Sequence, residues 1–279
     1  MIRTVADDAQ GWTQGRVRIG SRDLFYRRSS GPPGAVPILH VHGFAISGAY
    51  LMPTARRLVH HGVNIVPDLP GYGRSHRRDH TLDISELAEA VLALLDALGL
   101  DKVVLLGNSM GCPVSLQVAH AAPDRVDRLV LVSPAGGLHN QPLPRALLQL
   151  AQDGARETPR MARVAVPDYL RFGPVSALRL FHQLTLFPSL ERLQHAPVPT
   201  LAVLGSRDPL MPSPARVIEV AQTAPDHVTV VVIHGAAHAI NFSHPGELAN
   251  VVSAWLEDRE IVDDPEQPGD ARVFPIPRD

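Results

Sequence analysis

The sequence predicts an α/β fold in which helices cover both faces of a mostly parallel central sheet. Short apolar runs, typical of strands buried on both faces, alternate with segments whose apolar residues recur at helical spacing. One interval, residues 137–197, has helical patterns interrupted by prolines and no strand pattern. We therefore expect a helical cap inserted over the strand ends, where ligands bind in such sheets.

The first elements are expected to be a polar hairpin followed by a strand, a helix and a second strand. Residues 16–19 and 24–27 show some alternation around a Gly-Ser-Arg-Asp turn, which predicts the hairpin. Residues 36–42 and 63–66 are the next apolar strands. Between them, Tyr50 and further apolar residues at helical spacing predict a helix.

The best-defined helix of the sequence follows these strands. Asp83 is placed as its N-cap with Glu86 three residues later, which is the pattern of a capping box. Gly99 is placed at its end, where glycine commonly follows the last helical turn. The later strands are predicted at 103–106, 129–132, 200–204 and 228–233, and later helices begin near Ser213 and Pro245.

The most informative segment is the strand at residues 103–106, which breaks at Gly107 and continues into a helical pattern. Gly107, Ser109 and Gly111 form a Gly-x-Ser-x-Gly motif in a strand, turn and helix context. In such an elbow the serine has a strained backbone, and glycines are needed because a β-carbon would collide as strand and helix close together. Ser109 is therefore the candidate nucleophile.

A serine hydroxyl needs a base within hydrogen-bond reach and an acid that orients that base. Asp208 follows the strand at 200–204, and His238 follows the strand at 228–233 in a loop of small residues. We favour His238 over His234 and His244, which flank the same loop.

A rival acid precedes the candidate nucleophile in the chain. Asp68 lies in an Asp-x-Pro-Gly turn, where bonding of its side chain to the backbone explains an aspartate. The expected chain order of nucleophile, acid and base favours Asp208.

The backbone N–H groups of Phe44 and Met110 are the candidate donors to an oxyanion. Met110 directly follows the candidate nucleophile at the start of a helix, and Phe44 follows the first central strand. His40 and His42 form an alternate-residue pair, but no third ligand is placed to complete a metal site. We therefore expect neither a metal nor a cofactor.

The composition indicates which partners and compartment to expect. Of the 279 residues, 45% are hydrophobic and 19% charged, and the formal net charge of -2 gives no reason to expect nucleic acid. The single cysteine, Cys112, fits a reducing compartment. No signal peptide or bilayer-spanning run is visible, so a cytoplasmic protein without a membrane partner is expected. The oligomeric state is not predicted.

These motifs, in this order, resemble the α/β-hydrolase fold superfamily. The segments that carry the resemblance are His42-Gly43-Phe44, Asp68-Leu69-Pro70-Gly71-Tyr72-Gly73-Arg74-Ser75, Gly107-Asn108-Ser109-Met110-Gly111, Gly205-Ser206-Arg207-Asp208 and Gly235-Ala236-Ala237-His238. The resemblance implies a triad of Ser109, Asp208 and His238. It also implies oxyanion donors at Phe44 and Met110.

The expected domains are a core formed by residues 1–136 and 198–257, a helical cap at 137–197 and a mobile acidic tail at 258–279. The expected function is a serine hydrolase that cleaves a small carboxylic ester through an acyl-enzyme.

Two alternatives stay open. The elbow is similar to that of carbon-carbon bond hydrolases acting on aromatic ring-fission products, in which Arg171 or Arg179 would hold a substrate carboxylate. Those enzymes usually have a tryptophan after the catalytic histidine, where this chain has Ala239. The second alternative is a member of the fold that binds a ligand without catalysis.

Overall fold

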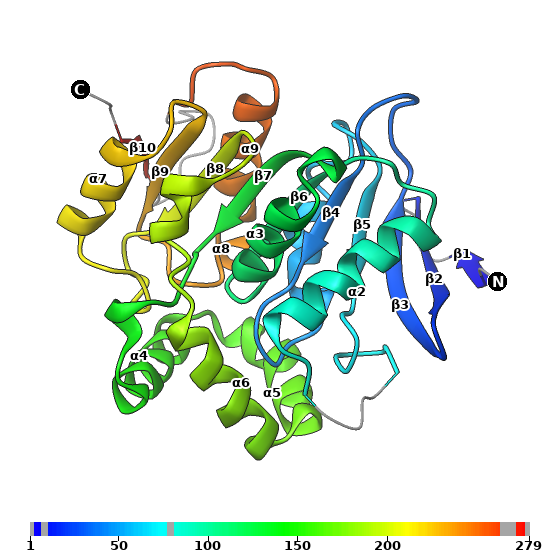
Figure 1. Cartoon of the computed structure of the whole chain (residues 1–279), viewed down its shortest axis with the longest axis horizontal. Coiled ribbons are helices and arrows are strands. Elements are labelled where there is room, and N and C mark those ends of the chain that lie inside the picture. Colours follow the sequence, from blue (N-terminus) through cyan, green and yellow to red (C-terminus); the bar gives the residue numbers. More distant parts are fainter. Residues whose placement is uncertain (1–2, 7–10, 77–80, 263–271, 277–279) are drawn as a thin grey trace.

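The computed structural model describes residues 3–6, 11–76, 81–262 and 272–276. In this part of the chain the strands form one sheet, in the order β1-β2-β3-β5-β4-β6-β7-β8-β9-β10, with helices on both of its faces (Figure 1). Neighbours between β5 and β9 are parallel, while β1, β2, β3 and β10 pair antiparallel at the two edges. The predicted fold class is confirmed.

The strands have the following bounds: β1 (Arg3–Ala6), β2 (Trp12–Ile19), β3 (Arg22–Ser29), β4 (Ile38–Val41), β5 (Asn64–Pro67), β6 (Val103–Asn108), β7 (Val126–Val132), β8 (Thr200–Gly205), β9 (Val228–His234) and β10 (Arg272–Pro275). The α-helices are α1 (Met52–Ala55), α2 (Ile84–Ala97), α3 (Gly111–Ala121), α4 (Leu143–Arg156), α5 (Pro159–Phe172), α6 (Pro174–Leu186), α7 (Pro214–Thr223), α8 (Ile240–Ser243) and α9 (Pro245–Leu256). Short 3-10 helices are η1 (Gly48–Leu51), η2 (Pro123–Arg125), η3 (Leu138–Asn140) and η4 (Glu191–His195).

The two faces of the sheet have separate cores, because successive side chains of a strand point to opposite faces. In β6, Val103 and Leu105 pack with apolar residues of α2, α3 and α7. Val104 and Leu106 pack instead with residues of α8 and α9. This explains why β6 appears in the sequence as an unbroken apolar run.

Two local predictions are confirmed by hydrogen bonds. Strands β2 and β3 pair antiparallel as the predicted hairpin. Asp83 accepts a hydrogen bond from the N–H of Glu86, and the Glu86 carboxylate accepts one from the N–H of Asp83, both at 2.9 Å. The capping box therefore begins α2 where the sequence places it.

Two expectations need correction. The helix expected around Tyr50 is reduced to η1 and α1, because the chain then tightens into turns whose N–H groups bond three residues back. Of the mobile tail predicted at 258–279, residues 263–271 and 277–279 lie outside the described residues, but residues 272–275 form β10, which pairs antiparallel with β9. The free edge of β9 offers unpaired backbone groups, and a strand from the tail satisfies them.

Helices α4, α5 and α6 belong to residues 137–197, which form no strand and which we call the cap segment. They lie together at one end of the sheet, at the bottom of Figure 1, with α5 in contact with η1. This is the end where β4, β6 and β7 finish, so the segment covers the loops that carry the candidate residues.

Candidate active site

Ser109 lies at the turn between β6 and α3 with a φ angle of 55°, in the left-handed region that non-glycine residues rarely adopt. A β-carbon on Gly107 would collide with the carbonyl oxygen of Gly111, and one on Gly111 would collide with that of Val41. The two glycines therefore allow the close approach of strand and helix. The predicted elbow geometry is present.

The loops after β8 and β9 bring Asp208 and His238 together. His238 Nδ1 lies 2.7 Å from Asp208 Oδ2, which positions Nδ1–H to donate to the carboxylate. The other carboxylate oxygen accepts a hydrogen bond from the N–H of Leu210 at 2.8 Å. Both side chains are buried, so the carboxylate fixes the orientation and tautomer of the ring.

The second ring nitrogen of His238 is the candidate base for Ser109. Nε2 is buried and has no hydrogen-bond partner among the described residues. His238 and Ser109 both line one cavity of about 610 Å³. This nitrogen is therefore left for a substrate complex to engage, since catalytic hydrogen bonds are often long or unformed in free enzymes.

The cavity lies between the sheet and the cap segment, and most of its walls are apolar. None of its lining residues is a lysine or an arginine. The lining residues are Gly43, Phe44, Ile46, Tyr50, Asn108, Ser109, Met110, Ala135, Gly136, Asn140, Leu150, Asp153, Gly154, Ala155, Glu157, Thr158, Pro159, Met161, Ala162, Ala165, Val166, Tyr169, Phe181, Leu184, Thr185, Leu210, His238 and Ala239.

Phe44 and Met110, the candidate oxyanion donors, both line this cavity. Within the described part of the chain, neither N–H donates a hydrogen bond. Met110 is the N-cap residue of α3, where the positive end of the helix favours negative charge. The two amides are therefore available to a ligand oxygen.

A buried tyrosine links three of the loops around the cavity. The Tyr50 hydroxyl accepts a hydrogen bond from the N–H of Gly43 at 2.8 Å and donates one to Asn108 Oδ1 at 2.5 Å. Asn108 Nδ2 in turn donates to the carbonyl oxygens of Val132, at 3.0 Å, and His238, at 3.4 Å. Because burial raises the pKa of Tyr50, its hydroxyl keeps the proton that it donates.

Replacing Tyr50 by Phe should therefore destabilise the fold. The change leaves the buried N–H of Gly43 and the Oδ1 of Asn108 without their partner, which should lower the free energy of unfolding by about 2 to 4 kcal/mol. Urea unfolding measures this difference. Tyr26→Phe is the matched control, because the Tyr26 hydroxyl has no hydrogen bond among the described residues. Equal effects of the two substitutions would contradict the linking role of Tyr50.

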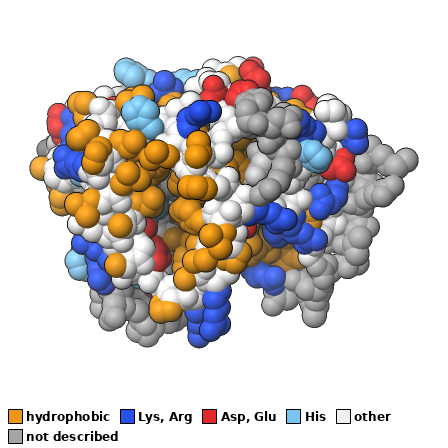
Figure 2. All heavy atoms as spheres, turned by 90° about the horizontal axis from the view of Figure 1, so that it is seen from below, with side chains coloured by type: hydrophobic (Ala, Val, Ile, Leu, Met, Phe, Trp, Pro, Cys, Tyr) orange, Lys and Arg blue, Asp and Glu red, His pale blue; other side chains and the backbone are white. Residues whose placement is uncertain are grey.

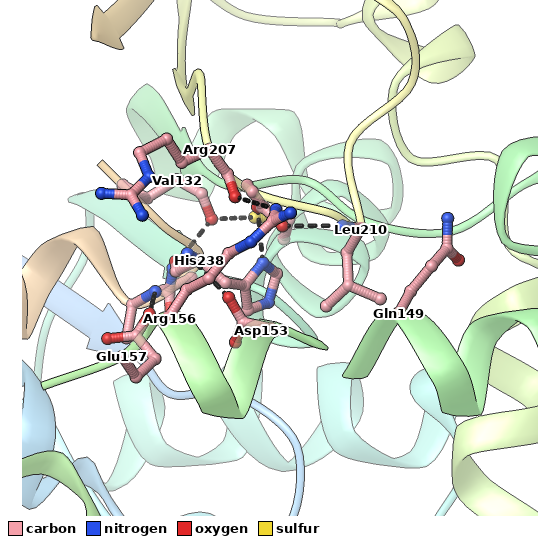
Figure 3. A network of polar contacts seen from close by, with 12 residues as sticks. Val132, Gln149, Asp153, Arg156, Glu157, Arg207, Leu210 and His238 are labelled. Atoms are coloured by element: carbon pink, nitrogen blue, oxygen red, sulfur yellow. Dashed lines mark hydrogen bonds and ion pairs between the residues drawn. The ribbon is translucent and has the colours of Figure 1, made fainter. Parts of the chain in front are cut away.

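Two carboxyl groups of the cap segment hold the loop that carries His238. Asp153 Oδ1 accepts a hydrogen bond from the N–H of His238 at 3.1 Å, and Glu157 Oε1 accepts one from the N–H of Ala239 at 2.7 Å. Figure 3 shows both side chains pointing toward that loop from α4 and its C-terminal end. Burial raises the pKa of both carboxyl groups.

The three neighbouring carboxyl groups also act on the imidazole. Burial alone would lower the pKa of His238, but the charge and hydrogen bond of Asp208, with smaller effects from Asp153 and Glu157, outweigh it. Together they raise the pKa of His238 from 6.5 to about 9. The imidazolium form of this residue is therefore strongly stabilised.

The arginines predicted to bind a substrate carboxylate lie elsewhere. Arg171 and Arg179 are exposed, and neither lines the cavity. Arg171 Nη1 donates to the carbonyl oxygen of Gly73 at 3.1 Å, which ties α5 to the core.

The rival candidates for the base and the acid also lie away from the cavity. His234 is exposed with Nδ1 3.3 Å from Ser206 Oγ, and His244 is half-buried. Asp68 is fully buried and accepts hydrogen bonds from the N–H groups of Gly48 and Arg74 at 2.9 and 2.8 Å. Its bonding matches the structural role expected for an aspartate in this turn.

Three of the four ring nitrogens of the histidine pair at the first central strand contact protein groups, and His40 Nδ1 is buried with no partner among the described residues. His40 Nε2 lies 2.7 Å from Asn64 Oδ1, and both ring nitrogens of His42 contact backbone groups, the carbonyl of Gly43 and the N–H of Leu69. Burial lowers the pKa of both histidines, so they are neutral. Among the described residues, side chains suitable for a metal ion meet at His60, His61 and Glu257, on the surface away from the cavity.

The sequence did not identify Tyr50, Asn108, Asp153 or Glu157 as parts of the site. A signal for the last two exists, since the cap segment has seven arginines but four acids, and two of these acids are four residues apart. Residues at this spacing share one face of a helix. Which face the helix turns toward His238 depends on tertiary packing, which the spacing alone does not give.

Comparisons with known proteins identify the family of the chain. Residues 38–251 match the model of the alpha/beta hydrolase family. The chain is 31% identical, over 90% of its length and 71% of the relative, to the dihydrolipoyllysine-residue acetyltransferase component of the acetoin cleaving system of Pseudomonas putida. It is 36% identical to 2-hydroxy-6-oxononadienedioate/2-hydroxy-6-oxononatrienedioate hydrolase 1 of Dechloromonas aromatica, over 51% of this chain and 52% of the relative.

A solved structure described as a membrane phospholipase A, a novel bacterial virulence factor, superposes with a TM-score of 0.74. The match has 25% sequence identity and covers 89% of this chain and 87% of the other. Among the described residues, no helix is both long enough and apolar enough to cross a lipid bilayer.

Proposed function

Because the chain belongs to the alpha/beta hydrolase family, we propose that it is a serine hydrolase that cleaves small, uncharged carboxylic esters through an acyl-enzyme. The observation that carries this proposal is the His238–Asp208 pair: His238 lines the same cavity as Ser109, and its Nε2 has no hydrogen-bond partner among the described residues. The similarity to a phospholipase A structure supports an ester as the substrate. The cavity of about 610 Å³ suits a small molecule.

In the proposed reaction, Ser109 Oγ attacks the ester carbonyl carbon while His238 Nε2 takes the hydroxyl proton. The imidazolium, stabilised by Asp208, then gives this proton to the leaving alkoxide, and an acyl-serine remains. Water attacks the acyl group in the second half with His238 again as base. The products are one carboxylic acid and one alcohol, and the serine recovers its proton.

The negative charge of each tetrahedral intermediate would lie on the former carbonyl oxygen. The N–H groups of Phe44 and Met110 are proposed to bind this oxygen, because both line the cavity and have no acceptor within the described residues. Tyr50 supports the loop before Phe44 through its hydrogen bond to Gly43. The proposed role of Tyr50 is thus to position the oxyanion loop.

A panel of para-nitrophenyl esters with rising acyl length tests the proposed function. We expect turnover of the short uncharged esters, with kcat/KM falling once the acyl chain exceeds what the cavity holds. Release of nitrophenolate reports the rate. No turnover of any ester by folded protein would favour the non-catalytic member of the fold that the sequence left open.

The rate should depend on pH through His238. A base must be neutral to accept a proton, and its raised pKa of about 9 means that the imidazole is mostly protonated at neutral pH. We therefore expect kcat/KM of the free enzyme to increase with pH up to about 9. Initial rates with a short ester across this pH range measure the rise in kcat/KM.

The neighbouring carboxyl groups provide the control for this pH prediction. Glu157→Gln removes one negative charge that raises the pKa of His238, so the rise in kcat/KM should move to lower pH. Glu89→Gln, on the exposed side of α2, should leave it in place. A pH profile of kcat/KM that stays unchanged in Glu157→Gln would contradict the coupling of this carboxyl group to His238.

Carbon-carbon bond hydrolysis is the second candidate, favoured by the similarity to the Dechloromonas aromatica hydrolase. Against it, the cavity has no arginine or lysine to pair a carboxylate, and Asp153 and Glu157 line its wall. Like charges in a confined site repel, so an anionic ring-fission product should bind poorly. A dienoic ketoacid added to the ester panel distinguishes the two reactions, because faster turnover of this acid than of the short esters would favour carbon-carbon bond hydrolysis.

A further inference from the structure

The exposed side chains of the cap segment with a permanent charge are all arginines. Of its seven arginines, six are exposed, whereas none of its four acids is. The exposed arginines are Arg145, Arg156, Arg160, Arg163, Arg171 and Arg179. The acids are all buried or half-buried, and three of them, Asp153, Glu157 and Asp168, accept hydrogen bonds from core N–H groups. Among the exposed charged residues of the cap segment, there are thus six arginines and no acid.

The same segment exposes large apolar side chains. Nine of the twelve large hydrophobic residues that are exposed in the described part of the chain belong to it. Leu138, Leu170 and Val175 have 81%, 79% and 72% of their surface exposed. In Figure 2, which views the molecule from the cap side, apolar side chains gather over this face with lysine or arginine side chains beside them. An exposed apolar cluster of this kind indicates an interaction surface.

Helix α4 exposes part of its apolar surface, although Leu143, Ala146 and Leu150 pack against the core. It buries Gln149 and Asp153 against the core and exposes Leu147 and Leu148. Helix α5 is also strongly amphipathic with low overall hydrophobicity, and none of its side chains is fully buried. Arginine-bearing helices with these properties are typical of those that lie in the plane of a lipid-water interface.

We propose that the cap segment docks on an anionic lipid surface, with its arginines at the headgroups and its exposed leucines and valines between them. Charge complementarity favours an anionic lipid surface over a second copy of the chain as the partner of this face. In a symmetric dimer each patch would meet itself, and arginines would then face arginines. Anionic lipid attracts each basic residue near the surface by about 1 kcal/mol.

Two residues of the docked face also line the cavity. Val166 and Tyr169 of α5 line the cavity and are themselves exposed, with 53% and 37% of their surface accessible. A surface docked here would lie against residues that form part of the cavity wall. An uncharged ester dissolved in lipid would reach Ser109 without crossing bulk water.

Vesicle co-sedimentation of the full chain tests this proposal. One set of vesicles contains only phosphatidylcholine, and the other replaces a quarter of it by phosphatidylglycerol. We expect binding to the anionic vesicles at least tenfold stronger than to the neutral ones, and its loss at high salt because salt screens the attraction. Sedimentation does not depend on hydrolysis, so the result is independent of the proposed ester activity.

Two pairs of substitutions outside the cavity separate the contribution of charge to vesicle binding from that of apolar burial. Arg160→Gln with Arg163→Gln should weaken binding to anionic vesicles by about thirtyfold, since two charges of about 1 kcal/mol each are removed. Leu170→Gln with Val175→Gln should weaken it by about tenfold through lost apolar burial. Circular dichroism checks that each variant is folded.

Charge and apolar controls are available on other surfaces of the molecule. Arg18→Gln with Lys102→Gln removes two charges outside the cap segment, and Ile218→Gln changes an exposed apolar residue of α7. Both should bind like the unmodified chain. No sedimentation, equal binding to both vesicle types, or a dimer in solution that the leucine-valine substitution breaks would each overturn the proposal.

Discussion

Ser109→Ala should reduce kcat for a short para-nitrophenyl ester by about a million-fold. The catalysis that remains should come from substrate binding and oxyanion stabilisation alone. The expected effect is this large because Ser109 is proposed to form the bond to the acyl group, and no other hydroxyl is placed at the elbow. Steady-state kinetics with the purified variant measure the loss. KM should change little, since the hydroxyl adds little to ground-state binding.

Stability needs a separate check, because Ser109 has a positive φ angle that alanine tolerates no better than serine. The unfolding midpoint of Ser109→Ala should therefore stay close to that of the unmodified chain. Ser85→Ala, at an exposed position of α2, controls for the loss of a serine hydroxyl. Retention of more than a hundredth of the activity in Ser109→Ala would assign the reaction to another nucleophile.

Asp208→Asn should lower kcat by about ten-thousand-fold while the shape of the site is retained. The amide preserves the size of the side chain, but it removes the charge that stabilises the imidazolium and can bond the ring in the wrong tautomer. The pKa of His238 should fall, because Asp208 is the strongest of the groups that raise it. Histidine resonances followed by NMR across a pH series measure this fall alongside the kinetics.

The buried rival acid gives the matched comparison for this prediction. Asp68→Asn weakens the contacts of a carboxylate that bonds Gly48, Arg74 and Arg27, so it should cost stability. Its kcat should stay within about tenfold of the unmodified value, because Asp68 does not line the cavity. A larger loss of kcat in Asp68→Asn than in Asp208→Asn would exchange the roles proposed for the two acids.

Local rules explain which parts of the fold could be predicted from the sequence. The capping box of α2 and the glycines of the elbow involve residues a few positions apart, so their chemistry is visible in the sequence. The alternation of buried strands and amphipathic helices predicted the sheet and brought Asp208 and His238 to the same edge. These are contacts that the regular fold itself produces.

The remaining features depend on packing between distant segments. From the sequence, Arg171 and Arg179 are candidates for substrate binding, but α5 and α6 turn both side chains toward solvent. The same helices turn acids inward, and Asp153 and Glu157 reach the His238 loop across more than 80 residues of chain. Tyr50 meets Asn108 across 58 residues. No periodicity encodes such pairings, because each depends on how a helix is rotated against the core.

Intact mass spectrometry after exposure to a fluorophosphonate tests the central claim most directly, since this reagent modifies a serine only when a neighbouring base activates it. We expect one adduct per chain, mapped to Ser109, absent from Ser109→Ala and formed far more slowly in Asp208→Asn. A folded chain that gains no adduct, or an adduct that persists in Ser109→Ala, would contradict it.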